Sequence, residues 1–248
     1  MKPFRQEALL LLLLWTLSGC GADGSAQKQV ESSAPDALVS SSEKEDHILS
    51  TLSATVDEGR TLTLQAIGKQ RTDLDEWGVR EVRVYDGESL LQTLSVQDAI
   101  EAGGIDGIEA GYTSCWSVEE AMTIHDMNFD GYDDLDLFGW SPNNTIPHYY
   151  WLWDQETQRY QFAFILQGAE ADPESQEIRA TAKSFGDDGP EGGFYQTNIY
   201  RYVDFGELAL VRREVTQIRG GKSLLEVYQV TDGQFHLVET REAPDGTA

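Results

Sequence analysis

The sequence predicts an all-β protein that is built mainly from antiparallel hairpins and contains at most one short helix. Short runs in which apolar and polar residues alternate recur along the chain, and turn residues separate them. Three segments resemble one another, since an apolar strand reaches an Asp-containing turn and returns as an apolar strand: 84–87, 152–155 and 229–235. This repetition favours a small β-propeller-like arrangement of hairpins or a β-sandwich.

The first residues have the features of a bacterial lipoprotein signal peptide. A basic start, Met1-Lys2-Pro3-Phe4-Arg5, precedes a short apolar run, and Leu17-Ser18-Gly19-Cys20 resembles a lipobox. We therefore expect cleavage after residue 19, a lipid such as palmitate on Cys20, and an extracytoplasmic location at the cell membrane or outer membrane. A cleaved signal without a lipid, or a membrane anchor, is the alternative.

The mature chain is predicted to be strongly acidic. Loss of residues 1–19 removes Lys2, Arg5 and Glu7, which leaves 16 basic and 42 acidic residues. Such a charge argues against binding to nucleic acid or adhesion to anionic lipid headgroups, since like charges repel. It is compatible with calcium, with a cationic partner, or simply with solubility.

Four segments are expected along the chain. Residues 1–19 form the signal peptide and residues 20–46, rich in Ser, Ala, Gln and acidic side chains, form a disordered tether. Residues 47–242 form one β-rich calcium-binding domain, and residues 243–248 form a polar tail. No intramolecular disulfide is possible once Cys20 carries a lipid, because Cys115 is the other cysteine of the chain.

The elements of the domain follow from its alternating pattern and its turns. Ser95-Val96-Gln97-Asp98 is typical of a helix start, and the short helix should continue to Ala102 before Gly103-Gly104. Acidic loops are expected over 168–176 and 186–193, the second being either a mobile loop or a second cation site. The predicted strands cover 61–66, 79–85, 90–94, 121–125, 135–140, 147–154, 160–166, 178–185, 195–203, 208–218, 224–230 and 235–239.

The segment from Asp126 to Asp134 has the residue spacing of a calcium loop. Its predicted ligands are the side chains of Asp126, Asn128, Asp130 and Asp134, together with the backbone carbonyl of Tyr132. Gly131 permits the tight turn that closes such a loop around a hard cation.

The ligand spacing departs from an EF-hand at its end. An EF-hand closes with a bidentate Glu at its twelfth position, where this chain has Leu137, and helices rather than strands flank it. A shorter loop that ends at Asp134 and joins two strands is therefore expected, with Ca²⁺ as the cofactor. An acidic hairpin turn without a metal is the alternative, because Asp, Asn and Gly are common turn residues.

The segment 149–153 could serve either the core or a ligand site. Tyr149, Trp151 and Trp153 share one face of the predicted strand, while Tyr150 and Leu152 make its other face apolar, which favours burial. Exposed rings of Trp140, Trp151 or Trp153 would instead form a platform for a glycan or a peptide.

The sequence offers no strong sign of an enzyme. It contains no Gly-x-Ser-x-Gly elbow, His-Glu-x-x-His helix or phosphate-binding loop, and paired carboxylates are unavoidable in so acidic a chain. Cys115 is expected to be a buried small side chain rather than a nucleophile. His125, beside the loop, is expected to pack or hydrogen-bond at a strand end, and His148 and His236 have no evident partners.

The loop with Leu135, followed by Tyr150-Trp151-Leu152-Trp153-Asp154 and Tyr160-Gln161-Phe162, resembles a bacterial family of secreted or lipid-anchored calcium-binding β proteins. That family includes an immunity lipoprotein that inhibits a lysozyme-like peptidoglycan hydrolase. The resemblance covers roughly residues 115 to 166 well, and dockerins and integrin-type propeller repeats share the same ligand spacing. It implies a small β-propeller-like fold with the calcium loop between strands.

These observations predict a lipid-anchored, extracytoplasmic, calcium-binding protein that is not an enzyme. It would act as a binding or inhibitor module, with a cell-wall hydrolase as the expected protein partner and the membrane reached through its N-terminal lipid. The alternatives are a glycan- or peptide-binding surface lipoprotein and a carboxylate-dependent hydrolase.

Overall fold

A computed structural model describes residues 45–71, 75–103, 111–139, 146–184 and 194–243. Contacts between Cα atoms separate the chain into two units, Met1–Ser42 and Glu43–Ala248, and all the described residues lie in the second unit. The signal peptide, Cys20, nearly all of the tether and the polar tail after residue 243 lie outside the described residues.

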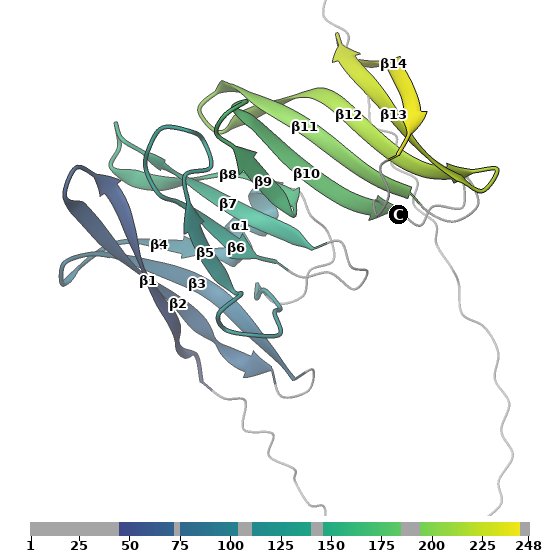
Figure 1. Cartoon of the computed structure of the whole chain (residues 1–248). Coiled ribbons are helices and arrows are strands. Elements are labelled where there is room, and N and C mark those ends of the chain that lie inside the picture. Colours follow the sequence, from purple (N-terminus) through teal and green to yellow (C-terminus); the bar gives the residue numbers. More distant parts are fainter. Residues whose placement is uncertain (1–44, 72–74, 104–110, 140–145, 185–193, 244–248) are drawn as a thin grey trace, which may run out of the picture. The chain divides into compact units, whose positions relative to one another are not determined.

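The described chain forms three antiparallel sheets, each with its strands in sequence order (Figure 1). The N-terminal sheet contains β1 (His47–Asp57), β2 (Arg60–Arg71), β3 (Glu76–Asp86) and β4 (Ser89–Ser95). The central sheet contains β5 (Met122–His125), β6 (Asp134–Phe138), β7 (Pro147–Asp154) and β8 (Arg159–Gln167). The C-terminal sheet contains β9 (Ala169–Asp172), β10 (Glu177–Ser184), β11 (Phe194–Asp204), β12 (Glu207–Arg219), β13 (Lys222–Thr231) and β14 (Gln234–Glu242).

The all-β prediction with one short helix is confirmed within the described residues. The helix α1 spans Val96–Gly103, and the Ser95 hydroxyl accepts a hydrogen bond from the Asp98 backbone N–H at 3.2 Å. This is the N-terminal cap that the Ser95-Val96-Gln97-Asp98 segment predicts. In the part of the chain that the structure describes, no helix has both the length and the apolar character needed to cross a membrane.

The central sheet is buried on both faces. One face, with Tyr149, Trp151 and Trp153, joins a core cluster that also contains residues of the N-terminal sheet such as Leu62 and Val84. The other face packs against the C-terminal sheet in a second cluster, which includes Tyr150, Leu152 and Phe164 of the central sheet and Ile178, Tyr200 and Leu208 of the C-terminal sheet. An unbroken apolar run is what burial on both faces requires, because successive side chains of a strand point to opposite faces.

Two strands differ from the sequence-based expectation. β1 lies in a segment for which no strand was predicted, since its Ser and Thr residues hide the alternation that places Ala54 and Val56 in the core. The predicted loop over 168–176 contains β9, which pairs with β10. Asp172 closes the turn between them by accepting hydrogen bonds from the backbone N–H groups of Glu174 (3.0 Å) and Ser175 (3.3 Å).

Candidate functional site

The acidic loop lies between two neighbouring strands of the central sheet, as predicted. β5 ends at His125 and β6 begins at Asp134, and these two residues are paired across the sheet. The loop is thus a strand connection that begins and ends at one edge of a short hairpin.

Hydrogen bonds gather the first three predicted ligands around one turn of backbone. The Asp126 carboxylate accepts the backbone N–H groups of Asp130 (3.1 Å) and Gly131 (2.9 Å). The Asn128 side-chain oxygen accepts the same Asp130 N–H at 3.2 Å. Gly131 has φ 88°, a left-handed conformation that glycine adopts without strain. The loop therefore folds so that the Asp126 and Asn128 oxygens face a common point.

Asp130 completes this group. Its carboxylate accepts the Tyr132 backbone N–H and the Asn128 amide, each at 2.9 Å. Partial burial raises the pKa of Asp130, the negative charge of Asp126 raises it further, and the two hydrogen bonds oppose the shift. Carboxylate and amide oxygens that lie close together and repel one another form a ligand set that a hard cation such as Ca²⁺ would stabilise.

Asp134 lies in a different environment from the other predicted ligands. Asp134 is 1% exposed. Its carboxylate accepts hydrogen bonds from the backbone N–H groups of Met127 (2.8 Å), Asn128 (3.2 Å) and Trp153 (2.8 Å). Burial raises its pKa to about 7, against the effect of these hydrogen bonds. With three of its roughly four acceptor positions in use, Asp134 holds the loop onto β7 and has little capacity left for a metal.

Asp133 attaches the end of the loop to the N-terminal sheet. Its backbone N–H donates to the Thr55 carbonyl at 2.9 Å, and its carboxylate accepts the Thr55 N–H at 2.6 Å. The Tyr160 hydroxyl donates to the Asp133 carbonyl at 2.9 Å. The C-terminal half of the loop is therefore fixed, while Asp126, Asn128 and Asp130 lie on its more exposed half.

The described residues do not by themselves identify a metal centre. Among them, no three acidic, histidine or cysteine side chains form a group that could hold a metal ion. Asn128 and the Tyr132 carbonyl are not acidic, histidine or cysteine ligands. The ligand set of Asp126, Asn128, Asp130, Tyr132 and Asp134 therefore stays a prediction.

A cavity of about 420 Å³ adjoins the loop. The loop contributes Asn128 and Phe129 to its wall. The turn between β9 and β10 contributes Ser175 and Gln176, and β11 contributes Arg201 and Tyr202. The rings of Phe129 and Tyr202 meet edge to face with their centroids 6.3 Å apart. Phe129 itself has φ 65°, which is uncommon for a residue with a side chain and marks a locally constrained backbone.

The cavity presents apolar and polar groups together. The Arg201 guanidinium donates to Glu177 at 2.8 Å, and the Tyr202 hydroxyl donates to the Met127 carbonyl at 3.4 Å. Burial raises the pKa of Tyr202, so its hydroxyl stays protonated. Aromatic rings, amides and one guanidinium can bind a ligand that has both an apolar face and hydrogen-bonding groups, and the volume is typical of small-ligand pockets.

Burial, the favoured prediction for the 149–153 segment, is confirmed, and the alternative of an aromatic platform is wrong for Trp151 and Trp153. Trp151 is 3% exposed and Trp153 is 0% exposed, because the central sheet is covered on both faces. Trp140 lies outside the described residues. Among the tryptophans that the structure describes, Trp116 is the exposed one (69%), and its ring meets that of Phe138 edge to face at 6.5 Å. No periodic pattern surrounds Trp116 in the sequence, so its exposure could not be predicted from its neighbours.

Cys115 and His148, two side chains of reactive types, each contact a neighbouring group. Cys115 is 1% exposed, its thiol donates to the Trp77 carbonyl at 3.3 Å, and burial raises its pKa to about 12, as expected of an unreactive thiol. His148 lies 2.7 Å from the Asp136 carboxylate through its Nδ1 atom. Strand pairing between β6 and β7 creates this contact, which the sequence did not indicate.

No protein-family model matches the chain. No curated protein matches it either. Among solved structures, it is similar to one described as "Structure of a Xanthomonas Type IV Secretion System related protein", with 11% sequence identity and a TM-score of 0.47. That alignment covers 76% of this chain and 93% of the other. So distant a likeness supports no inference about function, and the resemblance to calcium-binding immunity lipoproteins stays a prediction.

Proposed function

We propose that this protein is a lipid-anchored, extracytoplasmic binding module whose ligand-binding surface is stabilised by calcium. The observation that carries the proposal is the position of Asn128 and Phe129. Asn128 belongs both to the group of converging oxygens and to the wall of the adjoining cavity, and Phe129 is the next residue of that wall. A cation bound by the loop would therefore order the surface that contacts a ligand.

The donor set supports calcium over a transition metal. The exposed half of the loop offers carboxylate and amide oxygens from Asp126, Asn128 and Asp130, and Ca²⁺ prefers six to eight oxygen ligands. The Tyr132 carbonyl and water would supply the others. Asp134 would contribute mainly by orienting the loop from beneath.

A basic cell-wall hydrolase is the partner that the charge of the chain favours. The formal net charge of −25 would attract a basic protein over several ångströms and raise the rate of its association. In this proposal the protein inhibits the hydrolase by occupying its substrate cleft and is not itself an enzyme. The resemblance to a family that contains such an inhibitor motivates this choice.

The first experiment is a calorimetric calcium titration of the full chain, with thermal unfolding measured in calcium and in EDTA. We expect about one ion per chain and a higher melting temperature with calcium. Asp126→Ala and Asp130→Ala should lose both effects. Asp232→Ala, in the turn after β13, removes an equal charge outside the loop and should leave both unchanged. If the wild type ignores calcium, the calcium proposal is wrong.

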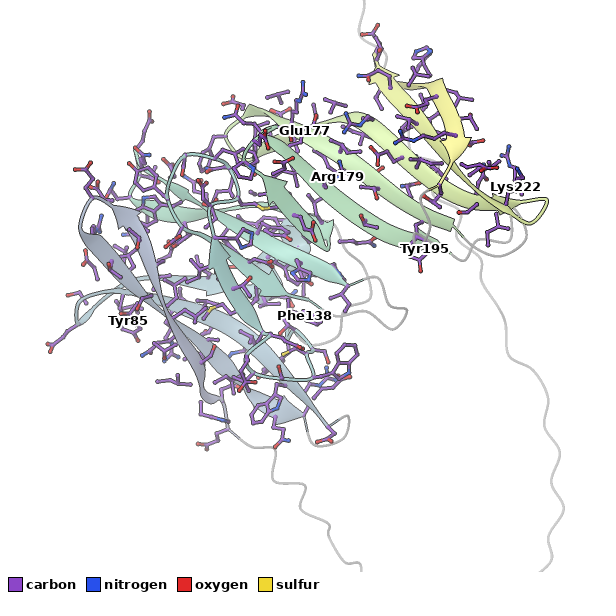
Figure 2. All side chains as sticks on the ribbon, viewed as in Figure 1. Tyr85, Phe138, Glu177, Arg179, Tyr195 and Lys222 are labelled. Atoms are coloured by element: carbon purple, nitrogen blue, oxygen red, sulfur yellow. The ribbon has the colours of Figure 1, made fainter. Side chains whose placement is uncertain are left out.

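The second experiment tests the cavity against a panel of purified muramidases with calcium present. Arg201→Ala should weaken inhibition at least tenfold, because Arg201 lines the cavity. Arg179→Ala is the matched control, since Arg179 lies on β10 in the same sheet (Figure 2) and does not line the cavity. An absence of binding to every muramidase would rule out the inhibitor role and leave the calcium result standing.

A glycan-binding role has one observation in its favour, the exposed ring of Trp116 beside Phe138. Aromatic faces stack on the apolar faces of sugar rings. In this alternative the chain would sediment with insoluble peptidoglycan, and Trp116→Ala would abolish that co-sedimentation while Arg201→Ala would not.

A further inference from the structure

The exposed apolar side chains of this protein are concentrated in one part of the fold. Six of the nine large apolar side chains that are exposed in the described residues lie between residues 203 and 238: Val203, Phe205, Ile218, Phe235, Leu237 and Val238. Three of the six belong to β14, every residue of which is exposed. Exposed apolar side chains on the edge strand β14 indicate an interaction surface.

The outermost strand of the C-terminal sheet is open to pairing. β14 hydrogen-bonds to β13 on one side, and on its other side it pairs with no strand among the described residues (Figure 1). Figure 2 shows side chains standing on both faces of β13 and β14. An edge strand without proline offers backbone N–H and C=O groups to another strand, and in β14 a β-bulge at Val238 separates this row into two parts.

This part of the surface is nearly neutral in an otherwise acidic protein. Residues 207–242 contain five basic and six acidic residues, whereas the whole chain contains 18 and 43. Two copies of so acidic a chain repel each other over most of their surfaces. Repulsion is least where β12, β13 and β14 lie, so this is where a second copy can approach.

The charges of β14 are complementary to those of a second β14 in antiparallel orientation. Glu239 and Arg241 are two residues apart, lie on the same face and are 3.4 Å from each other. A twofold axis through Thr240 would place Glu239 of each copy opposite Arg241 of the other. An axis through Val238 would instead place these charges opposite Leu237 and Phe235. Opposite charges in direct cross-strand pairs stabilise a sheet.

We propose that two copies of this chain associate through β14 and form one continuous antiparallel sheet across a twofold axis at Thr240. The paired stretch is centred on Glu239 to Arg241, on the C-terminal side of the β-bulge at Val238, and Glu239 and Arg241 form two reciprocal ion pairs. This contact is isologous, so it closes at two copies. The inference does not depend on calcium or on the cavity, because β14 contributes to neither.

Sedimentation velocity of the full chain in a mild detergent, at protein concentrations from about 1 to 200 µM, measures this association. Because the paired stretch is short, we expect a dissociation constant on the order of 10 µM, weaker than for interfaces of standard size. Glu239→Arg and Arg241→Glu should each weaken dimerisation at least tenfold, since each places like charges opposite one another. Glu207→Arg, at the start of β12, makes the same change in net charge as Glu239→Arg and should leave dimerisation unchanged.

A mixture of the two variants distinguishes the proposed register from unspecific association. In the Glu239→Arg chain both positions are basic, and in the Arg241→Glu chain both are acidic. The mixture should therefore form heterodimers with nearly wild-type affinity, and the double charge swap in one chain should restore the homodimer. A wild type that stays monomeric throughout, or a dimer that neither reversal weakens, would overturn the proposal. Circular dichroism spectra that match the wild type confirm that each variant is folded.

Discussion

The strand β7 of the central sheet and the last strand, β14, both carry large apolar side chains but bury them to very different extents. Five successive residues of β7, Tyr149 to Trp153, are at most 3% exposed, whereas all nine residues of β14 are exposed. The difference lies in their neighbours, since layers cover β7 on both faces and β14 ends its sheet. The continuous apolar run of β7 thus belongs to the core on both faces of its sheet, whereas the apolar side chains of β14 stay exposed.

The largest expected effect is a difference in the free energy of unfolding lost when an apolar side chain of β7 or of β14 is removed. Trp153 is 0% exposed, meets Tyr160 edge to face at 5.2 Å and lies under the Arg60 guanidinium. Trp153→Ala should lower the free energy of unfolding by about 3–5 kcal/mol, the usual cost of removing a buried ring. Phe235→Ala, on β14, should cost less than about 1 kcal/mol, because its ring is 43% exposed and loses mainly a contact with Arg213.

Urea unfolding followed by circular dichroism measures both values at a protein concentration below that of dimerisation. Equal costs for the two variants would contradict the comparison, because they would mean that β14 is buried in solution.

The next effect concerns the carboxylates of the same two regions. Asp134→Ala would leave the buried N–H groups of Met127, Asn128 and Trp153 without their acceptor, so we expect a loss of about 3 kcal/mol in EDTA. Glu239→Ala should cost less than about 0.5 kcal/mol, since its ion pair with Arg241 is largely exposed. The same urea measurement, with EDTA present, compares them. A small cost for Asp134→Ala would show that water replaces the lost carboxylate.

Much of the fold follows from the sequence because local chemistry determines it. The strand over 147–154, the Ser95 cap of the helix and the Asp86-Gly87 turn were predicted from neighbouring residues and lie where expected. The strand β1 was missed because its Ser and Thr residues resemble those of a loop, although alternate positions reach the core. The grouping of strands into sheets of four, four and six was not predictable, because no local pattern marks where one sheet ends.

In the candidate site, too, the features set by neighbouring residues were predictable and those set by distant contacts were not. The sequence located the acidic loop between two strands, since its ligand spacing is contained in nine consecutive residues. It did not distinguish buried Asp134 from the other carboxylates, because the N–H group of Trp153 comes from a strand 19 positions away. The cavity joins Phe129 to Tyr202, which are 73 positions apart, and only the packing of two sheets reveals it.

The last expected effect is a dependence on pH that follows from Asp134, a buried carboxyl of the central sheet. Burial raises the pKa of Asp134 to about 7 in the folded chain, whereas an unfolded Asp has a pKa near about 3.9. The folded state therefore binds this proton more tightly. The contribution of Asp134 to the free energy of unfolding is complete below about pH 4 and declines as the pH rises to about 7.

Comparison with Asp134→Asn isolates this contribution from the repulsion among the other acidic groups, which also grows with pH. Urea unfolding in EDTA at about pH 4.5, 6 and 7.5 should show the wild type losing stability relative to the variant. Calcium should reverse the trend near neutral pH if the loop binds it, because the cation favours ionised carboxylates. A difference that stays constant with pH would mean that the three backbone N–H groups keep Asp134 ionised despite its burial, and the central sheet would then hold a buried charge.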